Sequence, residues 1–152
     1  MLILWISLAM AEEVTVCQSG CVFSDLGLAL LQADPNDEVL IEDDTPLVLD
    51  ATLINVPITL KATTADPVSL SLNGPLRIES TVTVENFVLS GSSATLVEVA
   101  AGHSGTVRSV TVDTHTVGSV TAFTTDGALV LDGVTFKQID SSGQPAAVLA
   151  GP

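Results

Sequence analysis

The sequence has few aromatic and few basic residues. Aromatic side chains make up 3% of the 152 residues and tyrosine is absent, so large rings cannot dominate the core. Lysine and arginine number four against 18 acids, which gives a net charge of −14. Nucleic-acid binding depends on cations that neutralise phosphates, so this composition excludes nucleic acids as partners. Anionic membranes and polyuronate sugars would be repelled too, unless divalent cations bridged them.

Cysteine is also scarce, since Cys17 and Cys21 are the only two. In an oxidising compartment they would pair, and Gly20 permits the tight turn that so short a loop needs. The loop-entropy model gives such a bond about 2 kcal/mol, so it would fix local geometry rather than hold the fold together. A metal site needs more ligands, and we expect no metal and no cofactor.

The chain contains no apolar run of the ~20 residues that span a bilayer. Residues 2–8 are apolar apart from Ser7, and Ala9-Met10-Ala11 follows before the acids Glu12 and Glu13. A short apolar segment followed by small residues at −3 and −1 is typical of a secretory signal peptide. A basic start is missing, and the alternative is a buried N-terminal strand. We expect a signal peptide at 1–11, a mature domain at 12–152, and a secreted or cell-envelope location without a transmembrane segment.

Aliphatic residues with many Thr and Ser replace the aromatics, and β-branched side chains favour strands. One short helix is expected early. Ser24 is a candidate N-cap, and Leu26, Ala29, Leu30 and Ala33 recur at helical spacing. Pro35 disfavours a helical conformation at Asp34 and ends the helix. Such a helix can cover one end of a repetitive fold.

The rest of the chain repeats with a period near 24 residues. Segments 84–89, 107–112 and 131–136 align without gaps, each with an apolar residue, a charge, a small turn-former, and then two apolar positions around a variable one. A second set at 96–99, 120–123 and 146–149 interleaves with the first, and we align Val99 and Leu149 with Phe123. The segment 58–60 is placed one longer coil before Phe87.

This repetition predicts an all-β, right-handed parallel β-helix with a short N-terminal capping helix. A β-sandwich also uses short strands, but gap-free repetition favours the solenoid. Phe87, Val110 and Val134 should form one buried column. Asn86, Ser109 and Gly133 should mark a bend, because Asn and Gly tolerate left-handed backbone. The repeat reaches Leu149 without a polar cap, which predicts self-association through the C-terminal edge.

The chain resembles the pectin lyase-like right-handed β-helix superfamily. The resemblance lies in Val14-Thr15-Val16-Cys17, the Phe23-Ser24-Asp25-Leu26 entry to a helix ending at Asp34-Pro35, and the strands Val39-Leu40-Ile41 and Ile58-Thr59-Leu60. It implies an N-terminal cap followed by the first coils. It does not imply one function, because the fold hosts lyases, hydrolases, esterases, adhesins and inert stalks.

The catalytic motifs of that superfamily are largely missing. Hydrolases of the fold use carboxylates with Gly-His-Gly and Arg-x-Lys motifs. Here Gly102-His103-Ser104 and Asp43-Asp44 are the only echoes. Lyases need an arginine base beside a calcium-binding acidic cluster, and Arg77 and Arg108 are the only arginines. We therefore expect no enzyme activity and no catalytic residue.

Arg108 has a structural explanation. It occupies the same outward repeat position as Glu85 and Asp132, and adjacent coils lie about 4.8 Å apart. Glu85, Arg108 and Asp132 should therefore form a charge ladder of perhaps 0.2–1 kcal/mol per pair. Asp113 and His115 form at most half a metal site. The acids Glu38, Glu42, Asp43, Asp44 and Asp50 match no known calcium loop.

Two functional hypotheses remain. The first is a non-catalytic secreted or cell-envelope module that is structural or binds a glycan or protein partner. The alternative is the N-terminal fragment or remnant of a polysaccharide lyase or hydrolase. The sequence beyond Pro152 would separate them.

Overall fold

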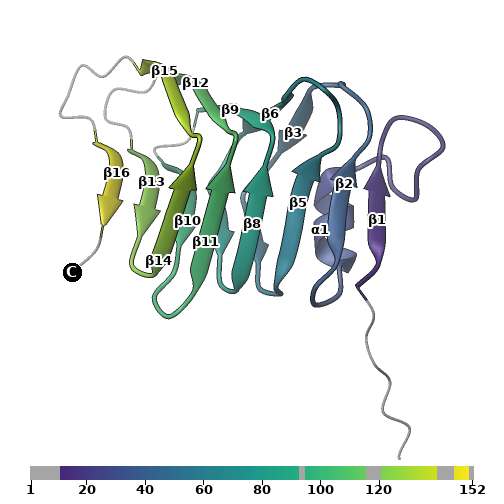
Figure 1. Cartoon of the computed structure of the whole chain (residues 1–152), viewed down its shortest axis with the longest axis horizontal. Helices are drawn as coiled ribbons and strands as arrows, with labels where there is room; N and C mark the ends of the chain where they lie inside the picture. Colours follow the sequence, from purple (N-terminus) through teal and green to yellow (C-terminus); the bar gives the residue numbers. More distant parts are fainter. Residues whose placement is uncertain (1–10, 93–94, 116–120, 140–145, 151–152) are drawn as a thin grey trace, which may run out of the picture.

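The computed structural model describes residues 11–92, 95–115, 121–139 and 146–150. Within these ranges the chain winds as a right-handed parallel β-helix, and one short helix, α1 (Leu26–Gln32), lies near its N-terminal end (Figure 1). The predicted fold class is confirmed.

Each coil contributes one strand to each of three parallel sheets, called A, B and C here. Within the described residues, sheet A contains six strands, and sheets B and C contain five each. Sheet A is β1 (Glu13–Val16), β2 (Glu38–Ile41), β5 (Ile58–Ala62), β8 (Thr81–Glu85), β11 (Ser104–Arg108) and β14 (Ala128–Asp132). Sheet B is β3 (Leu47–Leu49), β6 (Val68–Leu72), β9 (Phe87–Gly91), β12 (Thr111–His115) and β15 (Thr135–Ile139). Sheet C is β4 (Thr52–Ile54), β7 (Leu76–Ile78), β10 (Thr95–Val99), β13 (Thr121–Thr125) and β16 (Ala146–Ala150).

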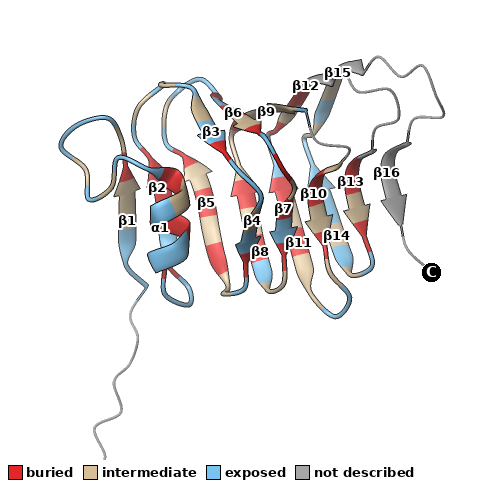
Figure 2. Cartoon of the chain, turned by 180° about the vertical axis from the view of Figure 1, so that it is seen from behind, coloured by how far each residue is buried: buried red, intermediate tan, exposed pale blue. Residues whose placement is uncertain are grey.

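The core consists of aliphatic columns that run along the solenoid axis. Parallel register places the same inward position of each coil above the last, so one column on sheet A is Val39, Leu60, Val84 and Val107, all fully buried. Figure 2 shows buried positions alternating with more exposed ones along these strands. Thin aliphatic side chains suit this arrangement, because three sheets enclose too little space for many aromatic rings.

The bend between sheets A and B is built as the sequence predicts. Asn86, Ser109 and Gly133 follow β8, β11 and β14, and all three have positive φ, at 67°, 49° and 64°. The Asn86 side-chain amide donates to the carbonyl oxygens of Ala62 (3.1 Å) and Thr64 (3.0 Å) in the previous coil. This side chain therefore ties two neighbouring bends together.

The predicted column follows from the same register. Phe87 and Val110 are buried, and Val134 is half-buried and packs against the core. Thr111 pairs with Val88 on one side and with Thr135 on the other, which places these three residues one above another.

Three predicted alignments are wrong. Ile58 pairs with Val82, so β5 belongs to sheet A and no longer coil precedes Phe87. Phe123 pairs with Val97 and with Val148, not with Val99 and Leu149. The errors arise because all the strands alternate apolar and polar residues, so the pattern alone does not distinguish one sheet from the next.

The helix cap also differs from the prediction. Asp25, not Ser24, is the N-cap of α1, and its Oδ1 accepts from the Leu28 backbone nitrogen at 2.8 Å. An ionised carboxylate accepts a stronger hydrogen bond than a hydroxyl and also favours the positive end of the helix. Leu26, Ala29 and Leu30 face the core, and α1 contacts β1, β3 and β4 at the N-terminal end of the solenoid.

Candidate functional site

A charged hollow lies on the outer face of sheet C. It has a volume of about 230 Å³ and is lined by Arg77, Glu98, Val99, Ala100, Ala101, Thr124, Thr125 and Asp126. Arg77 on β7, Glu98 on β10 and Thr124 on β13 occupy the same outward position of three successive coils. The register of sheet C therefore brings together residues that lie far apart in the sequence.

Arg77 is held by carboxylates on two coils. Its Nε donates to Glu79 Oε1 at 2.8 Å, and its Nη1 lies 3.7 Å from Glu98 Oε2. The hydrogen bond and charge of Glu79, with smaller contributions from Glu98 and Asp126, raise the pKa of Arg77. The guanidinium therefore stays cationic while keeping donors that face the hollow.

The rim of the hollow is fixed by backbone contacts. The Asp126 backbone nitrogen donates to the Val99 carbonyl oxygen at 3.0 Å, and Thr125 Oγ1 donates to the Gly127 carbonyl oxygen at 2.9 Å. A Cβ at Gly127 would collide with the carbonyl oxygens of His103 and Ala100, so the close approach of this turn requires glycine. The small side chains of Ala100 and Ala101 leave the space open.

The outward charges of sheet A form ion pairs between coils. The register places Arg108 between Glu85 and Asp132, and Arg108 Nε lies 3.9 Å from Asp132 Oδ2. Glu85 instead forms its ion pair with Lys61 of the preceding coil, where Nζ and Oε1 are 3.4 Å apart. The alternation of sign thus begins one coil earlier than the three residues singled out in the sequence.

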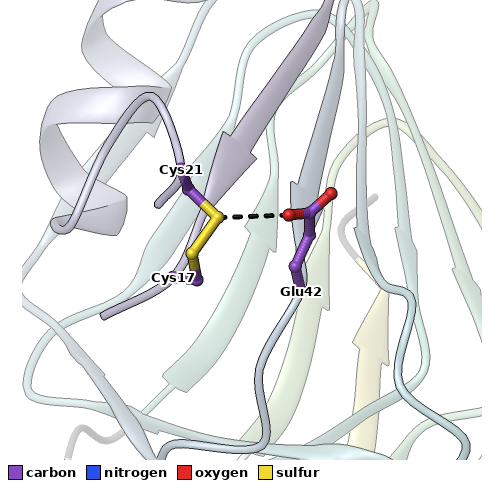
Figure 3. A group of neighbouring side chains, drawn as sticks. All are labelled: Cys17, Cys21 and Glu42. Atoms are coloured by element: carbon purple, nitrogen blue, oxygen red, sulfur yellow. Dashed lines mark hydrogen bonds between the residues drawn. A yellow bond between two sulfur atoms is a disulfide. The ribbon is translucent and has the colours of Figure 1, made fainter. Parts of the chain in front are cut away.

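The structure confirms the disulfide between Cys17 and Cys21. It also brings Glu42, at the end of β2, to the bond, with Oε2 3.2 Å from Cys21 Sγ (Figure 3). The two sulfurs and a Glu42 oxygen lie within 4.8 Å of one another, which is metal-ligand spacing. A disulfide sulfur carries no proton and is no thiolate ligand, so in the oxidised protein this group is a packing contact.

The residues that echo polygalacturonate hydrolases lie apart. Asp43 follows β2, and its carboxylate accepts from the backbone nitrogens of Gln18 (2.7 Å) and Thr45 (3.3 Å). His103 precedes β11, three coils further along sheet A and at the opposite ends of its strands. Asp113 pairs in register with Lys137, and the side chain of His115 lies outside the described residues.

The sequence pattern missed the hollow on sheet C. Arg77 and Glu98 are 21 residues apart, close to one coil, and this spacing was the available signal. It carried little weight because the coils differ in length.

Among the described residues, no helix is long and apolar enough to cross a membrane. No protein-family model matches the chain, and neither curated proteins nor solved structures show significant similarity to it.

Proposed function

We propose that this protein is an exported, non-catalytic β-helix that binds a neutral glycan in the hollow on sheet C. The observation that carries the proposal is the Arg77 guanidinium, held by Glu79 and Glu98 beside a floor of small residues. Fixed donors and acceptors around a concave, partly apolar surface are what a polyhydroxyl ligand needs.

The charges favour a neutral sugar over an acidic one. Glu98 and Asp126 can accept hydrogen bonds from sugar hydroxyls, and Arg77 can donate to a ring or hydroxyl oxygen. These carboxylates outnumber the single cation that lines the hollow, so a uronate would be repelled. The apolar surface of Val99 and the two alanines suits the C–H groups of a sugar ring.

The family and the location are part of the same proposal. The N-terminal cap followed by parallel coils supports assignment to the pectin lyase-like superfamily. The apolar segment ending at Ala11 supports export, and the disulfide is consistent with an oxidising compartment. Self-association through the C-terminal edge and descent from a polysaccharide lyase or hydrolase stay as alternatives.

Calorimetric titration with neutral tetrasaccharides of glucose, mannose and N-acetylglucosamine, alongside tetragalacturonate, tests the proposal. We expect a neutral sugar to bind and Glu98→Ala to weaken it about 10- to 100-fold, the worth of hydrogen bonds to a charged group. Glu85→Ala is the matched control, because Glu85 also pairs with a base across coils but lies on sheet A. Equal affinity of both variants, or binding of tetragalacturonate alone, would contradict the proposed site.

A further inference from the structure

Asp37 is a buried acid at the junction between α1 and β2. Its side chain belongs to a residue that is 4% exposed. One carboxylate oxygen accepts from the Asp34 backbone nitrogen at 2.8 Å, and the other accepts from the Glu12 backbone nitrogen at 2.9 Å. The same carboxylate therefore holds the chain after the helix and the start of β1.

No cation accompanies this buried carboxylate in the described part of the chain. The ion pairs found there join Lys61, Arg77 and Arg108 to other acids. The titratable groups around Asp37 in sequence and register are the acids Glu12, Glu13, Asp34 and Glu38. Burial of an ionised carboxylate without a charged partner is costly, so this site is incomplete as it stands.

We propose that removal of residues 1–11 completes the site, because it turns the Glu12 nitrogen into an α-ammonium group that pairs with Asp37. A signal peptidase hydrolyses the Ala11–Glu12 peptide bond with one water molecule. Ala11 leaves with the new carboxylate, and the Glu12 amine takes up a proton. The inference rests on the export part of the proposed function and is independent of glycan binding.

The ion pair would couple processing to the stability of the N-terminal cap. The Glu38 backbone nitrogen donates to the Glu12 carbonyl oxygen at 3.0 Å, so Glu12 is already positioned by β2. Cleavage changes the Glu12 nitrogen from a neutral amide to a cation without requiring the strand to move. The unprocessed chain keeps a looser cap than the mature one.

Four forms of the protein test the pair. Protein released by a site-specific protease to begin at Glu12 is compared with its Nα-acetylated form, each with and without Asp37→Asn. We expect acetylation to lower the folded-to-unfolded ratio about tenfold, the worth of one charged hydrogen bond. In Asp37→Asn, acetylation should have little effect. Glu38→Gln, which changes an exposed acid, is the matched control and should leave the acetylation effect intact.

Equal effects of acetylation with Asp37 and with Asn at that position would overturn the pair, as would no effect in the unsubstituted protein. If Asp37→Asn fails to fold, the reaction rate of the Glu12 amine with acetic anhydride gives a second measurement. Native protein should react more slowly than the same protein in urea, and equal rates would refute the inference. N-terminal sequencing of exported protein tests cleavage separately, so a different cleavage site would defeat the export proposal without deciding the ion pair.

Discussion

The bend between sheets A and B offers a prediction in which one substitution stabilises the protein. Ser109 occupies the left-handed conformation with φ of 49°, between a coil with Asn86 and a coil with Gly133 at the same place. Serine is the least suited of the three to this conformation, and its exposed side chain makes no hydrogen bond among the described residues. Ser109→Gly therefore removes backbone strain without removing a contact.

The size of the effect follows from two opposing terms. A left-handed conformation costs an ordinary residue about 1–2 kcal/mol. Glycine loses about 0.4–1 kcal/mol more than other residues when the unfolded chain is ordered. The net gain is about 0.5–1 kcal/mol. For a domain of this size 1 kcal/mol shifts the melting temperature by about 2–4 °C, so we expect a rise of about 1–4 °C.

The reverse substitution is the matched control. A Cβ at Gly133 would meet the Ser109 nitrogen at 3.7 Å, an ordinary contact, so Gly133→Ala should cost only the backbone term of about 1 kcal/mol. Thermal and urea unfolding of both variants measure the difference. If Ser109→Gly lowers stability, or Gly133→Ala raises it, the strain argument is wrong.

Other substitutions test the core, the cross-coil hydrogen bonds and the disulfide. Val110→Asp places an unpaired charge in the column beneath Phe87 and should unfold the domain, because that cost is several kcal/mol against a typical stability of 5–15 kcal/mol; unchanged thermal stability would mean the column is misassigned. Asn86→Ala removes two hydrogen bonds to the previous coil and should cost about 2–3 kcal/mol in urea unfolding, whereas a loss below 0.5 kcal/mol would show that water replaces them. Thiol labelling of freshly exported protein should find Cys17 and Cys21 unreactive without reductant, and two labelled thiols would contradict the disulfide in that compartment.

The sequence by itself determined the architecture. A repeat near 24 residues, with apolar positions that alternate along each segment, leaves a parallel solenoid as the arrangement that buries every segment in the same way. The left-handed bend was readable because Asn86, Ser109 and Gly133 stand at one repeat position, and Asn and Gly are the residues that accept positive φ. The disulfide was readable because two cysteines flank one short turn.

The tertiary structure alone decided which residues meet across coils. A slip of two residues keeps every side chain on its own face, so alternation cannot choose between Val97 and Val99 as the partner of Phe123. Backbone pairing makes that choice, and it is what brings Arg77 beside Glu98. The contact of Asp37 with Glu12 likewise depends on β1 lying against β2, an adjacency across 25 residues that no local pattern specifies.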